Sequence, residues 1–185
     1  MKNKIQYSLL FFLAILLLSC NNGMTVSGRE YIHSGKKWHK NKQTVKRVVI
    51  KDTNDIKTLR KVLETAIKIN GFDADLNFID VSQVKNMEGL FAGGLFLPNL
   101  FTGDISSWDV SHVTNMKGMF FISVFNGDIS GWDVSNVKTF ESMFSASGFR
   151  GDVSGWDVRS DANMEKMFME GVSNVPSWFT GKLAK

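Results

Sequence analysis

The sequence predicts an α/β solenoid of about four stacked 24-residue coils, each with one strand and one short helix, behind an N-terminal strand-helix cap. Trp108, Trp132 and Trp156 recur with a period of 24 residues. Within each copy the apolar positions follow a strand-like alternation and then a helical stripe. A unit of this length cannot bury its own apolar face, so neighbouring units are expected to stack.

Residues 1–19 are interpreted as a lipoprotein signal peptide. Two lysines precede an apolar run, Ser8–Leu18, that is short for a membrane span. The run ends in Leu17–Cys20, which resembles the bacterial lipobox, and Cys20 matches the lipid-modified position. Cys20 is the only cysteine, so it has no intramolecular disulfide partner. We therefore expect a chain anchored to a bacterial membrane through lipid on Cys20; the alternative is a plain signal peptide with an incidental cysteine.

Residues 20–44 are expected to form a flexible basic linker, because they are rich in Asn, Gly, Ser and Lys and lack hydrophobic periodicity. The stretch Lys36–Lys51 holds seven basic residues and no acidic one. It is interpreted as a solvated tether, with contact to anionic headgroups or to an acidic partner as alternatives. Nucleic acid is a poor partner for an exported, tethered chain, so none is expected.

Residues 45–75 are predicted to form an N-terminal strand-helix cap. Valines and an isoleucine between Val45 and Ile50 predict a strand. A helix is predicted next, because apolar residues recur at helical spacing between a capping Thr53 or Asn54 and a terminating Asn70-Gly71.

The repeat array is expected to span residues 76–168. Its first copy begins at Leu76 and aligns Asp80 with Asp109, but five extra residues in the loop Ala92–Phe101 separate it from the second copy. In the last copy Asp161 replaces an apolar residue of the helical stripe. Residues 169–185 are interpreted as a C-terminal cap built around Val175, Trp178 and Phe179.

Each copy is expected to contribute one strand and one helix. The strand surrounds Trp108-Asp109-Val110, where side chains should point inward, outward and inward. The helix is indicated by apolar residues at positions i, i+3, i+6 and i+7, namely Val113, Met116, Met119 and Phe120. The methionines of this stripe are assigned to the core rather than to a soft-metal site.

The apolar pattern L-x-x-L-x-L and the motifs WDVSNV, NMxxMF and FNGDIS resemble the BspA-like family of leucine-rich-repeat bacterial surface proteins. The resemblance covers residues 45–168, and its motifs recur in register. It implies a leucine-rich-repeat-like array, display at the cell surface and adhesion to host or extracellular-matrix proteins. The residues themselves imply only display.

Aspartates recur at the outward strand position, where they should form a column: Asp80, Asp109, Asp133 and Asp157. Neighbouring strands lie about 4.8 Å apart, so adjacent carboxylates repel by about 0.9 kcal/mol even in water. The favoured explanation is that these side chains cap turns with Ser82, Ser111 and Ser135; calcium bridging and a ligand-binding surface are the alternatives. The candidate ligand-binding residues are Asp80, Asp109, Asp133, Asp157, Ser111, Ser135 and Phe78.

The sequence offers little from which to build an active site. No HExxH, GxSxG or glycine-rich phosphate loop is present, and the repeat glycines are interpreted as turn residues. We expect no catalytic residues, no metal and no cofactor. The predicted function is a binding module on an envelope lipoprotein, at the outer membrane or cell surface, that contacts a protein or glycan. The alternative is a structural or periplasmic lipoprotein with no host ligand.

Overall fold

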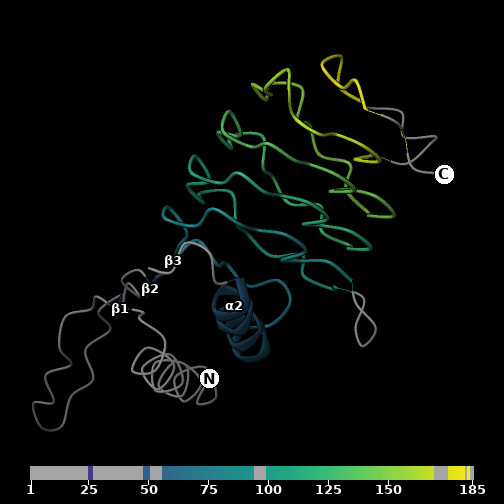
Figure 1. The fold of residues 1–185 in the computed structure, drawn as a ribbon. Coiled ribbons are helices and arrows are strands. Elements are labelled where there is room, and N and C mark those ends of the chain that lie inside the picture. Colours follow the sequence, from purple (N-terminus) through teal and green to yellow (C-terminus); the bar gives the residue numbers. More distant parts are fainter. Residues whose placement is uncertain are drawn as a thin grey trace, which may run out of the picture.

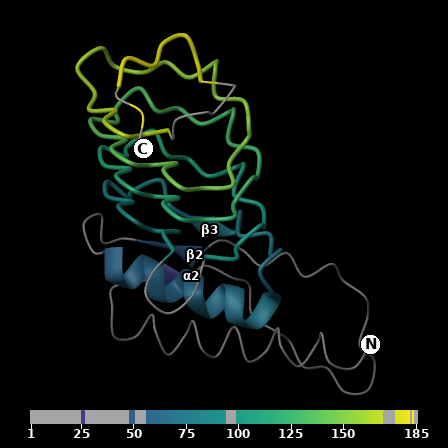
Figure 2. The same ribbon diagram turned by 90° about the vertical axis from the view of Figure 1, so that its right-hand side faces the viewer.

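A computed structural model of the chain describes residues 25–26, 48–50, 56–93, 99–168, 175–181 and 183. Figure 1 shows successive repeats stacked upon one another, with helix α2 at one end of the stack and the C-terminal segment at the other. In Figure 2, turned by 90°, α2 lies across the base of the stack. The predicted lipid-modified Cys20 and nearly all of the predicted linker lie outside the described residues.

A small three-stranded sheet stands at the helical end of the stack. Its strands are β1 (Thr25–Val26), β2 (Val48–Val49) and β3 (Ile79–Asp80), in the order β1-β2-β3. β1 pairs antiparallel with β2, and β2 pairs parallel with β3. The Ile50 N–H extends the second pairing by donating to the Asp80 carbonyl at 3.1 Å. The segment before the helix is thereby joined to the first repeat.

Helix α2, Ile56–Asn70, is the predicted N-terminal helix, and its presence and end are confirmed. Its apolar residues fall on one face, so that Leu59, Val62 and Leu63 are buried in the same cluster as the repeats. The helix stops at Gly71, whose φ of 100° lies in the left-handed region that favours glycine. The Gly71 N–H still donates to the Ile67 carbonyl at 2.8 Å, which completes the last turn.

The predicted α/β solenoid of strand-helix coils is wrong. Among the described residues α2 is the only helix, and the three strands have two residues each. The repeats consist of successive turns, and isolated parallel bridges join each repeat to the next. These bridges are Asp75↔Asp104, Asn86↔Asn115, Asn99↔Ser123, Asn115↔Thr139 and Thr139↔Asn163.

The predicted repeat helix fails because most of its backbone donors bond to the preceding or the next repeat. The Met116 N–H donates to the Thr139 carbonyl at 3.0 Å, and the Gly118 N–H donates to the Glu141 carbonyl at 2.8 Å. Gly118 has a φ of 57°, which a right-handed helix cannot accommodate. The remaining local bonds span three residues, as in the Met119 N–H to the Met116 carbonyl at 3.1 Å. Turns of this kind reproduce the apolar spacing of a helix without forming one.

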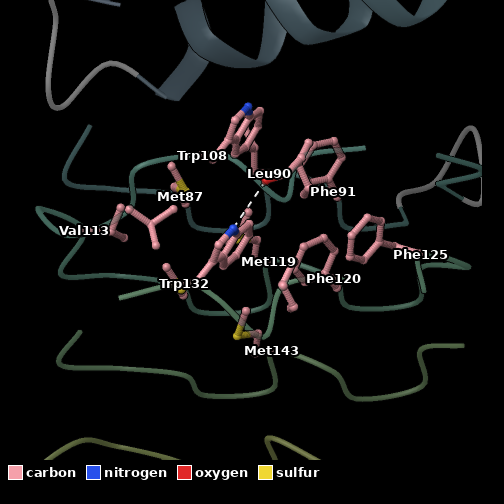
Figure 3. Packing of buried hydrophobic residues seen from close by; sticks show 14 of the residues in the cluster. Met87, Leu90, Phe91, Trp108, Val113, Met119, Phe120, Phe125, Trp132 and Met143 are labelled. Atoms are coloured by element: carbon pink, nitrogen blue, oxygen red, sulfur yellow. Dashed lines mark hydrogen bonds between the residues drawn. The ribbon is translucent and has the colours of Figure 1, made fainter. Parts of the chain in front are cut away.

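Apolar side chains from all four repeats and from α2 form one buried cluster. Trp108, Trp132 and Trp156 are each only 4% exposed, as the predicted inward position requires. Phenylalanines stack in two columns between repeats, with ring centroids 5.6 Å apart for Phe91 and Phe120 and 6.0 Å apart for Phe101 and Phe125. Figure 3 shows the rings of Phe91, Phe120 and Phe125 beside Trp108 and Trp132.

The tryptophans also connect the repeats through hydrogen bonds. Each indole N–H donates to a carbonyl of the preceding repeat, at 3.1 Å from Trp108 to Leu76 and at 3.3 Å from Trp132 to Ile105. In the C-terminal segment Trp178 donates to the Val153 carbonyl at 3.1 Å, and its ring stacks on Trp156 at 6.3 Å. Trp178 therefore continues the tryptophan column beyond the last repeat.

Candidate ligand-binding face

The predicted aspartates form a column that we call the outer column: Asp80, Asp109, Asp133 and Asp157. In three of them Oδ1 accepts the backbone N–H two residues on, at 3.0 Å for Asp80 and 3.1 Å for Asp109 and Asp133. The Ser111 and Ser135 hydroxyls each add a 2.6 Å bond to the same oxygen of their aspartates. These are the Asx turns predicted for the column.

Asp157 departs from this pattern because arginine follows it where the other repeats have serine. In the described residues Asp157 accepts no equivalent bond, and the Arg159 guanidinium instead makes two 2.8 Å bonds to Asp161. That ion pair is largely exposed and contributes little stability. In the described residues the Asx-turn bond of the outer column is therefore absent from the last repeat.

Turn formation leaves most of the outer column in solvent. The Ser135 hydroxyl and N–H hold the pKa of the Asp133 carboxyl below its usual value, because both bonds favour the ionised form. Asp109, Asp133 and Asp157 are all exposed. Capping and ligand binding are therefore compatible roles for the same side chains, since the turn bonds are made through Oδ1.

A second aspartate column, absent from the predicted site residues, runs beside the first: Asp75, Asp104, Asp128 and Asp152. Each accepts the N–H two residues on, at 2.9 to 3.0 Å, and all four are exposed. The Ser106 and Ser130 N–H groups are the main reason that the pKa values of Asp104 and Asp128 are lowered. The spacing Asp-x-Ser, which marks the outer column, would have identified most of this second column too.

Small residues lie between the two columns. Ser107, Gly131 and Gly155 occupy equivalent positions, and all three are exposed. A Cβ placed on Gly131 or Gly155 would meet no atom within 4 Å, so the backbone there faces open space. The face can therefore be approached closely between two rows of carboxylates.

A shallow hollow of about 320 Å³ opens where the first two repeats meet on this face. Its lining includes Phe78, Asp80 and Asp109, which the sequence had proposed as ligand contacts, together with Ser107. The Asn77 side chain fixes one wall by accepting the Ser107 N–H at 2.8 Å. The hollow combines an aromatic ring with two carboxylates, a lining suited to a cationic or polar group.

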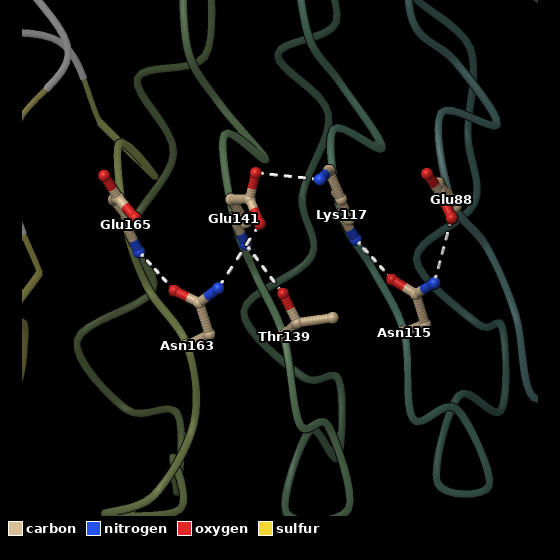
Figure 4. Close-up of polar contacts among 7 residues, drawn as sticks. All are labelled: Glu88, Asn115, Lys117, Thr139, Glu141, Asn163 and Glu165. Carbon is tan, nitrogen blue, oxygen red and sulfur yellow. Dashed lines mark hydrogen bonds and ion pairs between the residues drawn. The ribbon is translucent and has the colours of Figure 1, made fainter.

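A third polar column has mixed charge and a structural role. Figure 4 shows it around Asn115, Lys117 and Glu141. The Asn115 amide donates to Glu88 at 3.1 Å, and Lys117 pairs with Glu141 at 2.8 Å, which raises the pKa of the lysine. Because the charges of Glu88 and Lys117 each have a neutral or opposite partner in the neighbouring repeat, this column links repeats. It lacks the uniform charge of the aspartate columns.

The described residues contain no cluster of three histidine, cysteine or carboxylate side chains that could hold a metal ion. The calcium interpretation of the outer column therefore gains no support from them.

The repeat glycines, interpreted as turn residues, lie where neighbouring atoms approach closely. A Cβ placed on Gly127 would come within 2.7 Å of the Phe125 ring. Within the described part of the chain no helix is long and apolar enough to cross a membrane.

The family described as Mycoplasma protein of unknown function, DUF285, matches the chain over residues 36–120 and again over residues 57–178. Together the two matches extend from residue 36 to residue 178 and include both aspartate columns and the hollow. No curated protein and no solved structure matches the chain significantly.

Proposed function

The chain belongs to the DUF285 family, and from that premise we propose that it is a surface-anchored bacterial lipoprotein whose repeats bind a protein or glycan outside the cell. The proposal includes kinship with the BspA-like surface proteins, which the repeated motifs resemble, and an adhesin-like role. The partner class is a host or extracellular-matrix protein, and nucleic acid is not a partner.

One observation carries the binding role. Two columns of aspartates flank open, small residues, and a hollow beside Phe78 opens between the first two repeats. The same kind of turn also forms with uncharged asparagine, because Asn115 accepts the Lys117 N–H at 2.9 Å. Turn formation therefore explains why an acceptor side chain stands at these positions. It does not explain why that side chain is repeatedly an acid, and we attribute the negative charge to recognition of a basic partner.

The anchor is supported by the sequence of the leader. The apolar run ends in Leu17–Cys20, and an acyl chain contributes about 0.8 kcal/mol for each buried methylene. Several chains on Cys20 would hold the protein at a membrane for long periods. Replacing Cys20 with Ser and partitioning cells into a detergent phase tests this part, since the variant should leave the detergent phase and the parent should remain in it.

The alternative is a structural or periplasmic envelope lipoprotein with no host ligand. Treating intact cells with protease separates the two, because only a surface-displayed chain is accessible. We expect loss of the repeats from intact cells at a protease concentration that spares a periplasmic marker protein. Digestion that requires permeabilised cells would contradict surface display and favour the periplasmic alternative.

A further inference from the structure

Asparagine followed by glycine occurs at three places in the sequence, and two of these pairs lie in the described part of the chain. One is Asn70-Gly71 at the end of α2, and the other is Asn126-Gly127 between the second and third repeats. Such a pair is chemically reactive, because the glycine nitrogen can attack the side-chain carbonyl carbon of the asparagine. Glycine has no Cβ to hinder the backbone rotation that this attack requires.

The Asn70-Gly71 pair is held by hydrogen bonds at both reacting groups. The Gly71 N–H donates to the Ile67 carbonyl at 2.8 Å, and the Asn70 side-chain amide donates to the Ala66 carbonyl at 3.0 Å. Attack at this pair requires that both bonds break and that the end of the helix opens. The helix therefore protects Asn70 from the reaction.

The backbone around Asn126 is held less firmly. Within the described residues, the N–H groups of Asn126, Gly127 and Asp128 donate no hydrogen bond. At the equivalent positions of the preceding repeat, the N–H groups of Thr102 and Asp104 donate to backbone carbonyls at 2.8 Å and 3.1 Å. Asn126 is also exposed, so water reaches its side chain. The attacking nitrogen of this pair is therefore not engaged by the fold.

The next repeat supplies a donor to the oxygen of the group that is attacked. The Asn126 Oδ1 accepts the Arg150 N–H at 2.6 Å. This bond polarises the side-chain carbonyl and stabilises the negative charge that develops on Oδ1 when a nucleophile adds to Cγ. The stacking of repeats thus favours the reaction at Asn126, whereas the helix opposes it at Asn70.

We infer that Asn126 is a modification site, at which the side-chain amide is lost through a succinimide. The Gly127 nitrogen gives up its proton and bonds to Cγ of Asn126, and the side-chain nitrogen takes up a proton and leaves as ammonia. Water then opens the succinimide ring at either of its carbonyls, which yields aspartate or isoaspartate. Both products carry a new negative charge two residues before Asp128, so the modification adds charge beside the second aspartate column.

The test compares the two pairs in the native and the denatured full chain. The chain is incubated in water enriched in heavy oxygen at neutral and mildly alkaline pH, and its peptides are mapped by mass spectrometry. We expect labelled aspartate and isoaspartate at position 126, formed faster at the higher pH because the attacking nitrogen must lose its proton. The ratio of the denatured rate to the native rate should be at least about tenfold larger at Asn70 than at Asn126.

An Asn126→Gln variant is the matched control. Glutamine closes a ring on the following nitrogen far more slowly, so the label at position 126 should disappear while the rate at Asn70 stays unchanged. Equal protection of the two pairs in the native chain would overturn the inference. Aspartate at position 126 without isoaspartate would also overturn it, because direct hydrolysis of the amide bypasses the ring. Neither result bears on partner capture, so the proposed function stands or falls separately.

Discussion

At the scale of single residues, the repeats depend on side-chain acceptors that hold the backbone N–H two positions on. In the second repeat these acceptors include Asp104, Asp109, Asn115 and Ser123. Such bonds replace the backbone pairing that long strands and helices would supply. The same residue types that predict a site therefore also build the turns, so composition alone cannot separate the two roles.

Close approach of neighbouring repeats makes Gly103 sensitive to substitution. A Cβ at this position would overlap the Ala74 carbonyl oxygen and crowd the Phe101 ring. We expect Gly103→Ala to lower the free energy of unfolding by about 1–3 kcal/mol, as overpacking does. Gly131→Ala is the control, because its Cβ meets nothing within 4 Å and its effect should stay within about 0.5 kcal/mol. Equal denaturant midpoints for the two variants would contradict the observed packing.

Acid should destabilise the protein through the aspartate turns. The folded-state pKa values of Asp104, Asp128, Asp133 and Asp152 lie below the usual 3.8, chiefly because of bonds from the serines two residues on. Their contribution is complete above the unfolded value and is lost as pH falls through the lowered folded values. The melting temperature should therefore be nearly constant from about pH 7 to pH 5 and fall below about pH 4.

The Asp133→Asn variant provides the matched control for this pH dependence. Asparagine keeps an acceptor for the Ser135 N–H but does not titrate, so its decline in acid should be shallower than that of the parent. An identical acid decline in the two proteins would show that Asp133 does not contribute to the effect.

At the scale of elements, the sequence predicted α2 correctly and the repeat helices wrongly for one physical reason. In α2 the apolar face packs on one side, and no glycine interrupts it before Gly71. In the repeats the same spacing of apolar residues includes Gly118, and many N–H groups find partners in neighbouring repeats. Periodicity reports which side chains are buried and does not report where the backbone bonds go.

The tryptophan column is expected to dominate the stability of the stack. Trp132 is 4% exposed, and its indole N–H bonds to the preceding repeat at 3.3 Å. Trp132→Ala should lower the free energy of unfolding by about 3–5 kcal/mol. Phe72→Ala removes an aromatic ring that is 47% exposed, and it should cost much less. Equal losses in chemical denaturation would contradict the stacked arrangement.

At the scale of the whole molecule, the burial of the repeat tryptophans and the exposure of the outer column were predictable from a period of 24 residues. The hollow was not, because it forms only where Phe78 and Asp80 of the first repeat meet Ser107 and Asp109 of the second. Because the first repeat has diverged and is followed by five extra residues, a single sequence does not show which of its residues meet the second repeat.

The central claim is that the aspartate face binds a basic partner through its charge. The double variant Asp109→Asn/Asp133→Asn tests this claim most directly. Both asparagines keep the turn acceptors, so the melting temperature should stay within a few degrees of the parent. Capture of fibronectin or fibrinogen, the partner class implied by the resemblance, should fall in the variant. Capture by the parent should weaken as salt shortens the screening length from about 10 Å at 0.1 M to about 3 Å at 1 M. Unchanged, salt-independent capture by a folded double variant would contradict the claim and leave the aspartates as turn residues alone.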